Sequence, residues 1–506
     1  MKSVAIIGAG ISGLASGIYL LKNGFDVTIY EKNSYAGGFL TIWKRKNSII
    51  DGCMHWMQGS KDGTRLNKIW KELGAIDSKT EMIHPNSFCT VEYQGNVFHW
   101  YMDIDSLEKE FYKYSKDDDL ECKIFIDAVR QMGIMEIPSD IPYELIDPKE
   151  LKMDMNIMRK MRYYLSLSIG EVADRFHSEV IKYALKNCLV NEHFSAFYFI
   201  QTISNFTNGN SSIPKGCSKR MRDGILNKYL SLGGKIYYNS PVDEILIEDT
   251  KAIGIMLEDG KKYYADYIIP ACDIHYLDNH ILKGKYNLTP FKEYDNNKEK
   301  YPTYSYVIAS YRTKMNFSNM DIAVIKKIEE YNFKGIKGDA LSIRQYGYDE
   351  ELITNGYSTV QVYLTTYEDD YEIIKAMSKE EYQSFKQMVG EFFKNKLMEY
   401  YQTNDFELID VLTPLTYERY NNSYKGSFMT YALTPKVPQV SRSAFIDGLD
   451  NVIIANQWLM LPGGTGVAAV SGKFSASLIL FKEGLNYKLW FYCEIKKNWY
   501  NKFMMF

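Results

Sequence analysis

The stretch that decides the fold is KSVAIIGAGISGLASGIYLLKNGFDVTIYE, residues 2–31. Residues 2–7 form an apolar run that is typical of a buried parallel strand. Gly8, Gly10 and Gly13 follow at the spacing of a turn that leads from a strand into a helix. Gly8 permits the sharp turn, Gly10 lets the backbone approach a pyrophosphate, and Gly13 lets the helix pack closely on the strand.

The helix and the strand after it complete a dinucleotide-binding unit. Ile11 and Ser12 open the helix, whose N-terminus favours the negative charge of a phosphate. Residues 27–30 then form an apolar second strand, and Glu31 ends it. An acidic side chain there can accept hydrogen bonds from both ribose hydroxyls, whereas it would repel a 2′-phosphate. This register predicts a bound dinucleotide, with Lys32 beside it.

The composition excludes several other functions. The chain has 506 residues and a formal net charge of −3, which offers no basic surface to nucleic acid. Seven cysteines without a CxxC pair and seven scattered histidines predict reduced thiols, no metal site and a cytoplasmic protein. Glycines interrupt the N-terminal apolar run, and no run of about eighteen apolar residues occurs. We therefore expect neither a signal peptide nor a membrane-spanning helix.

A glycine pair follows the acidic residue. Gly37 and Gly38 allow a second close approach of the backbone to the same cofactor, which a simple nicotinamide dehydrogenase does not need. Thr41 comes next, and His55 lies in the segment IIDGCMHW; both are expected to contact the cofactor. His55 is the titratable candidate beside the cofactor, with a purely structural role as an equal alternative. Asp51 is expected either to orient this loop or to cap it.

From the first glycine turn to Gly37 and Gly38, the sequence resembles the flavin amine oxidase and phytoene desaturase superfamily. The resemblance implies FAD as the cofactor. It also implies an α/β fold, in which a Rossmann-type FAD-binding domain with a parallel sheet carries a discontinuous α+β substrate domain. Phe39 stands where the amine oxidases usually carry an arginine. This departure favours the desaturase branch.

The middle of the chain extends the resemblance. Residues 213–273 are similar to the family block in which a helix, a glycine turn and a strand precede a hairpin. A DG pair predicts this hairpin between strands at 253–257 and 262–267. By its position, Val242 inherits the family's contact with the adenine. The family's Pro-x-Gly-Gly is reduced to PKGC at residues 214–217, so its ligand contact is not carried over.

The segment TPLTYERYNNSYKGSFMTY, residues 413–431, resembles a stretch of carotenoid isomerases, phytoene desaturase-like proteins and retinol saturase relatives. The resemblance predicts a loop beside the flavin and the substrate, with Arg419 and Tyr420 as groups of the substrate pocket. The alternative is an ordinary turn in which Arg419 is a solvated surface residue.

A second glycine turn, LPGGTGVAAVSGK at residues 461–473, precedes a helix of small apolar residues. In the family this turn lies under the isoalloxazine ring, so we expect Gly463, Gly464, Gly466 and Val467 to contact it. Hydride uptake places negative charge on the pyrimidine edge of the flavin, and the N-terminus of a helix there would stabilise that charge.

The order of these motifs predicts a discontinuous organisation. The FAD-binding domain is expected at residues 1–80, 216–285 and 440–485, and the substrate-binding domain at residues 85–215 and 290–440. Within the substrate-binding domain, the residue patterns predict helices at 171–187 and around 379–401 and strands at 304–311 and 359–365. The tail, residues 486–506, carries aromatic residues at helical spacing with lysines beside them. It would form either an amphipathic helix on a membrane surface or a helix docked on the protein or on a second subunit.

These observations predict an FAD-dependent oxidoreductase that transfers hydride at flavin N5. Its substrate would be apolar, of the polyene or isoprenoid kind, and the reaction a desaturation, a saturation or a cis–trans isomerisation. His55, Arg419 and Tyr420 are the candidate catalytic residues, and the electron acceptor is left open. Two alternatives remain, an amine or amino-acid oxidase with the same cofactor domain and a non-enzymatic lipid-binding escort of the same fold.

Overall fold

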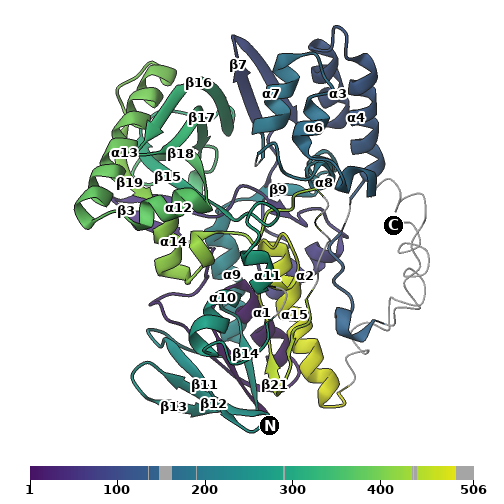
Figure 1. The fold of residues 1–506 in the computed structure, drawn as a ribbon, viewed down its shortest axis with the longest axis vertical. Coiled ribbons are helices and arrows are strands. Elements are labelled where there is room, and N and C mark those ends of the chain that lie inside the picture. Colours follow the sequence, from purple (N-terminus) through teal and green to yellow (C-terminus); the bar gives the residue numbers. More distant parts are fainter. Residues whose placement is uncertain are drawn as a thin grey trace.

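Figure 1 shows the fold in a computed structural model. The structure describes residues 1–40, 42–134, 136–146, 162–189, 191–288, 291–435, 437 and 442–485. Thr41 and the predicted amphipathic tail, residues 486–506, lie outside the described residues. Within the described part of the chain, no helix combines the length and the apolar character needed to cross a membrane.

The N-terminal unit forms as the sequence predicts. Strand β1 (Ser3–Ile7) is almost fully buried, and helix α1 (Ile11–Leu21) leads from it to strand β2 (Asp26–Tyr30). β1 pairs in parallel with β2 on one side and with β14 (Tyr267–Pro270) on the other. The full sheet has the order β10 (Lys235–Tyr237), β2, β1, β14, β21 (Leu449–Ile453) and β20 (Phe445–Ile446). The predicted α/β class with a parallel sheet is confirmed.

A small antiparallel sheet lies beside the parallel one (Figure 1). It contains β11 (Val242–Glu248), β12 (Lys251–Leu257) and β13 (Lys262–Tyr264). The hairpin between β12 and β13 is confirmed. The second strand is shorter than the predicted 262–267, because β13 ends at Tyr264. It divides because Asp266 turns away from the hairpin, where its carboxylate accepts a hydrogen bond from the Ser3 N–H at 2.8 Å.

The two ends of the described chain lie side by side. Helix α15 (Thr465–Lys482) packs against α1, and α9 (Cys217–Ser231) packs on another side of α1 (Figure 1). The approach is close, because a Cβ atom on Gly472 would lie 2.4 Å from the backbone oxygen of Ser12. The first and second glycine turns of the sequence therefore start neighbouring helices.

A seven-stranded sheet forms the other half of the molecule (Figure 1). Its order is β19 (Glu407–Leu412), β15 (Tyr304–Thr313), β18 (Ser358–Tyr367), β17 (Ile336–Gln345), β16 (Ala323–Phe333), β7 (Ser87–Tyr93) and β8 (Asn96–Tyr101). Neighbouring strands are antiparallel except β16 and β7. The sheet thus joins segments from both parts of the predicted substrate-binding domain, a division that stays a prediction.

Helix α13 (Lys379–Tyr401) covers this sheet and coincides with the predicted helix. Phe385, Val389, Phe393 and Leu397 recur every four residues on its buried face. Helix α12 (Glu368–Lys375) follows β18 directly.

A group of helices lies beside β7 and β8, and these are α3 (Ile104–Lys113), α4 (Asp119–Met132), α6 (Ile169–Ala173), α7 (Glu179–Asn187) and α8 (Ala196–Thr207) (Figure 1). The continuous helix predicted at 171–187 is wrong, because the chain breaks between α6 and α7. The buried carboxylate of Asp118 accepts hydrogen bonds there from the backbone N–H groups of His177 and Ser178 at 2.7 and 2.8 Å. Ser178 then caps α7.

Short elements connect these parts. They are β3 (Ile42–Arg45), β4 (Ser48–Asp51), β5 (Met57–Gln58), α2 (Arg65–Leu73), β6 (Met82–Ile83), η1 (Tyr143–Leu145), β9 (Ser211–Pro214), α10 (Ile274–Tyr276), η3 (Leu277–Ile281), α11 (Phe291–Asp295), η4 (Glu350–Leu352), α14 (Pro414–Asn421), η5 (Tyr424–Gly426) and η6 (Gln457–Leu459).

Candidate functional site

A cavity of about 310 Å³ lies at the carboxyl ends of β1, β2 and β14. Ligands of open parallel sheets bind at this edge. Its lining contains most of the predicted cofactor contacts, namely Gly8, Gly10, Ile11, Ser12, Glu31, Lys32, Gly37, Gly38, His55, Val242 and Gly464. Gly13 does not line it, because this glycine serves the packing of α1: a Cβ atom there would lie 2.1 Å from the Gly8 carbonyl oxygen.

The glycines leave the backbone open toward this cavity. Gly8 has a φ of +103°, and the Gly37 N–H donates to the Ala9 carbonyl oxygen at 2.9 Å. A Cβ atom on Gly38 would meet Gly10 Cα at 3.0 Å, whereas one on Gly10 would meet no atom nearer than 3.9 Å. The N-terminus of α1 has no side-chain cap. This open backbone at a helix N-terminus fits a phosphate group.

Glu31 is buried at the end of β2, and its carboxylate is held firmly. It accepts hydrogen bonds from the Ala9 N–H at 2.8 Å and from the Asn33 N–H and Nδ2 at 2.8 and 3.0 Å. Burial raises the pKa of Glu31 and outweighs these hydrogen bonds, which favour the charged form. Val242, at the start of β11, is also buried in the wall of this cavity.

Hydrogen bonds from Lys32 and Asn33 connect the wall of this cavity to α14. Lys32 Nζ donates to the Arg419 carbonyl oxygen at 2.8 Å, and Asn33 Nδ2 donates to the Tyr420 carbonyl oxygen at 2.9 Å. Tyr420 lines the cavity. The side chain of Arg419 is exposed and lines neither this cavity nor the larger one described below, so its predicted place in the substrate pocket is wrong.

The predicted loop at 413–431 is also wrong in part, because α14 begins directly after Thr413. Pro414 occupies the first turn of the helix, and the Thr413 N–H donates to Thr416 Oγ1 at 3.1 Å in a capping box. Phe39, at the site of the missing family arginine, stacks on Tyr417 of this helix with ring centroids 6.0 Å apart.

Asp51 fixes the loop that carries His55. Its Oδ1 accepts hydrogen bonds from the Cys53 and Met54 N–H groups at 2.9 and 3.0 Å. The same carboxylate accepts from the Ser218 N–H at 2.9 Å and from Ser218 Oγ at 2.7 Å, at the start of α9. Asp51 therefore orients the loop, which is one of the two predicted roles, and also joins this loop to the start of α9.

A second cavity, of about 1360 Å³, adjoins the first. Its wall is rich in aromatic side chains, among them Phe88, Phe194, Phe197, Tyr198 and Tyr304. Eight residues line both cavities, namely His55, Trp56, Tyr306, Tyr363, Phe428, Met429, Gly464 and Thr465. This shared wall connects the dinucleotide side of the molecule with a large, mainly apolar chamber.

The second glycine turn lies at the shared wall. Gly463 and Gly464 have φ values of +82° and +96°, and the Gly464 N–H donates to Gln457 Oε1 at 2.9 Å. Gly463, Gly466 and Val467 line the large cavity only. The turn and the N-terminus of α15 thus separate the two cavities.

His55 belongs to the shared wall and is neutral at neutral pH. Burial lowers the pKa of its imidazole well below the usual range, and the nearby charge of Arg344 lowers it further. Its ring packs edge-on against Tyr363 with centroids 5.1 Å apart.

Sequence reasoning missed Arg344, Tyr306 and Tyr363, which β17, β15 and β18 bring to the cavities. The two tyrosines lie in strands that the sequence predicts, but the face that each would turn inward was not indicated. Arg344 lies in a strand that the sequence reasoning did not predict.

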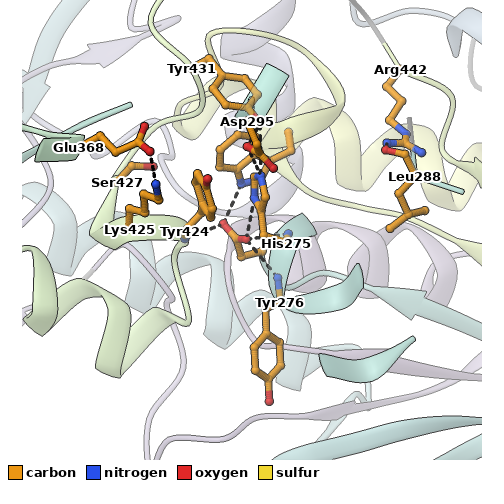
Figure 2. A network of polar contacts seen from close by, with 12 residues as sticks. His275, Tyr276, Leu288, Asp295, Glu368, Tyr424, Lys425, Ser427, Tyr431 and Arg442 are labelled. Atoms are coloured by element: carbon orange, nitrogen blue, oxygen red, sulfur yellow. Dashed lines mark hydrogen bonds and ion pairs between the residues drawn. The ribbon is translucent and has the colours of Figure 1, made fainter. Parts of the chain in front are cut away.

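Figure 2 shows a buried polar network that the sequence did not predict. His275 Nε2 lies 3.1 Å from Asp295 Oδ1, and the Tyr431 hydroxyl donates to the same oxygen at 2.5 Å. Asp273, which lines the small cavity, accepts a hydrogen bond from Trp458 Nε1 at 2.9 Å. The network thereby ties α10 and α11 to the wall of the small cavity.

The sequence profile of flavin containing amine oxidoreductases matches residues 11–480. The chain belongs to this family. Its cofactor is FAD, as predicted. The contacts of individual residues with FAD stay predictions, and the open glycine backbone with Glu31 at the end of β2 fits them.

Relatives and neighbours differ in what they act on. The chloroplastic prolycopene isomerase 1 of an Oncidium hybrid cultivar is 22% identical over 280 residues, which are 52% of this chain and 47% of that protein. A lycopene-forming phytoene desaturase of a Paracoccus species is 24% identical over 300 residues, 56% of this chain and 58% of that protein. The chain thus spans about half the length of such curated relatives. Cyclohexylamine oxidase from Brevibacterium oxydans shares the fold, with a TM-score of 0.56 and 17% identity over 96% of this chain and 99% of its own.

Proposed function

We propose that this flavoprotein desaturates, saturates or isomerises an apolar substrate of the polyene or isoprenoid kind. The observation that carries the proposal is the shared wall between the two cavities. FAD held along the small cavity would present its ring at Gly464 and Thr465, facing the large aromatic chamber. The names of the curated relatives, prolycopene isomerase and phytoene desaturase, support the same substrate class.

The chamber has the size and the surface for a long apolar molecule. Its volume of about 1360 Å³ exceeds that of an ordinary small-ligand pocket, which is roughly 300–1,000 Å³. Aromatic walls would hold a polyene by its faces and keep water out. FAD supplies the acceptance and return of hydride, so the chain's own residues need mainly to orient the reacting carbon and to exclude water.

The residues of the shared wall would perform this orientation. Tyr306 and Phe428 stack with ring centroids 4.9 Å apart, and Tyr306 packs edge-on against Tyr363. The neutral imidazole of His55 adds no charge to this surface. Because Tyr420 lines only the small cavity, the proposal gives it a role beside the cofactor, and Arg419 has no part in the proposal.

The experiment is a single turnover of the purified, FAD-loaded protein without oxygen. Phytoene and prolycopene in detergent are added to oxidised and to reduced protein in turn. Desaturation bleaches the flavin and moves polyene absorption to longer wavelength, saturation reoxidises reduced flavin, and isomerisation changes chromatographic retention without net electron transfer. Each of these results would support the proposal.

The same preparation tests the alternatives. Hydrogen peroxide released with a panel of amines or amino acids, without any reaction of a polyene, would replace the proposal with an oxidase. A colourless protein that does not take up added FAD would support the lipid-binding escort.

A further inference from the structure

Arg344 places a buried positive charge in the wall of the large cavity. It lies near the end of β17, and its side chain is only 6% exposed. Arg344 lines the large cavity and not the small one. Its charge therefore faces the substrate side of the shared wall and not the dinucleotide side.

No described residue neutralises this charge. Within the described chain, Arg344 makes one hydrogen bond, from Nη2 to the His55 carbonyl oxygen at 2.5 Å, and no carboxylate pairs with it. Its Nε atom is buried without a hydrogen-bond partner. A guanidinium has five N–H donors, so most of its hydrogen-bonding capacity is unused.

The neighbouring polar side chains are engaged with one another. The Tyr346 and Tyr363 hydroxyls donate to Gln361 Oε1 at 2.7 and 2.6 Å, and Gln361 Nε2 donates to the Asp51 carbonyl oxygen at 3.0 Å. Arg344 lies over the Tyr346 ring at 5.9 Å from its centroid. These groups are neutral, so they attract the cation without cancelling its charge. Burying such a charge is unfavourable unless an anion accompanies it.

We infer that Arg344 binds an oxyanion of the substrate, so that the substrate is an apolar unsaturated chain that ends in a carboxylate or a phosphate. A planar guanidinium recognises either group by paired hydrogen bonds. The apolar part of this inference rests on the proposed function, whereas the anionic part rests on Arg344 alone. Because Arg344 contacts His55 at the shared wall, the reacting carbons would lie near the anionic end of the chain.

The test compares an acid with its ester. Parinaric acid, a fluorescent polyene fatty acid, and its methyl ester are titrated into the FAD-loaded protein. We expect the acid to bind at least about tenfold more tightly than the ester, as a hydrogen-bonded charge pair would give. Arg344→Gln should remove most of this preference and change the affinity for the ester by less than about twofold.

Two variants make the result specific. Arg344→Lys keeps the charge without the planar fork, so part of the preference should remain. Arg312→Gln removes an arginine of the same sheet that lies outside both cavities and pairs with Glu407 at 2.5 Å, so the preference should be unchanged. The visible flavin spectrum reports whether each variant is folded. If Arg344→Gln does not fold, a reduced preference of Arg344→Lys for the acid decides.

Competition identifies the source of the oxyanion. Dodecanoate and dodecyl phosphate are used to displace parinaric acid, and the tighter competitor names the preferred head group. Equal affinities of the unaltered protein for parinaric acid and its ester would overturn the inference and leave the proposed function standing. If acetate or inorganic phosphate displaced the acid while the ester did not bind, Arg344 would keep its role and the apolar substrate class would fail.

Discussion

At the scale of single residues, two glycines of the same turn should respond differently to substitution. A Cβ atom on Gly10 meets no protein atom within 3.9 Å and extends toward the small cavity, whereas one on Gly13 would lie 2.1 Å from the Gly8 carbonyl oxygen. Gly10→Val should therefore abolish FAD retention while lowering the free energy of unfolding of the apoprotein by only about 1 kcal/mol. Gly13→Ala should destabilise the fold itself by about 1–3 kcal/mol.

Both effects are measured on the purified variants. The ratio of flavin to protein absorbance reports FAD retention, and denaturant unfolding of the FAD-free proteins reports stability. A Gly10→Val protein with full yellow colour would contradict the assignment of this turn to the pyrophosphate.

Also at the residue scale, Asp51 should stabilise the fold through its buried hydrogen bonds. Its carboxylate serves two loop N–H groups and both donors of Ser218, all inside the protein. Asp51→Ala would leave these donors without an acceptor, which predicts a loss of about 3 kcal/mol in the free energy of unfolding. Ser218→Ala removes the hydroxyl that donates to Asp51, so this change leaves no buried donor without an acceptor. The free energy of unfolding should therefore fall by only about 1 kcal/mol. Equal losses in the two variants, measured by denaturant unfolding, would contradict this explanation.

At the scale of elements, the network of Figure 2 should make stability depend on pH. Burial opposes the charge on His275, but the hydrogen bonds and charges of Asp273 and Asp295 prevail and raise its pKa to about 9 from 6.5. The ring also stacks on Tyr424 at 3.8 Å. A raised pKa in the folded state stabilises the protein below pH 6.5, and this contribution is lost as the pH rises to about 9. The loss should be on the order of 3 kcal/mol.

Unfolding at several pH values checks this expectation. His275→Asn should be less stable than the unaltered protein at pH 6. Its free energy of unfolding should then fall much less as the pH rises to about 9. His193→Asn, a substitution of an exposed histidine, should retain the decline. If the stability of the unaltered protein and of His275→Asn declined in parallel with pH, the decline would not come from the titration of His275.

The elements also show what the sequence could predict. The strands and helix at residues 2–31 and the helix α13 depend on local patterns, namely glycine spacing, apolar period and a capping serine, Ser378. The break at His177 depends on Asp118, which lies 59 residues away in the chain, and no local pattern contains it. For α14 the local signals were present, since Thr413 and Pro414 form a typical helix start.

The candidate site divides in the same way. The FAD contacts follow from glycines and an acidic residue within short motifs, so they could be named from the sequence. Arg344, His275 and Asp295 acquire their meaning only from partners in other strands and helices, and a single sequence carries no sign of such contacts. The misplacement of Arg419 has a related cause, because a family motif locates the segment but not the direction of each side chain.

At the scale of the whole molecule, the small cavity is built by both halves of the protein. Gly10 and Glu31 come from the parallel-sheet half, whereas Tyr306, Ile308 and Tyr363 come from the seven-stranded sheet. A cofactor held there touches both halves. We therefore expect FAD to stabilise them together and not the parallel-sheet half alone.

Thermal unfolding of the protein with and without FAD tests this expectation. At a free FAD concentration about one hundred times the Kd, binding should add about 2.7 kcal/mol to the free energy of unfolding. One transition should shift as a unit, with the tryptophan fluorescence and far-ultraviolet signals moving together. The Gly10→Val protein, which should not bind FAD, should show no shift under the same conditions. Two separate transitions, of which FAD moved only one, would show that the cofactor stabilises a single half and that the seven-stranded sheet folds independently of it.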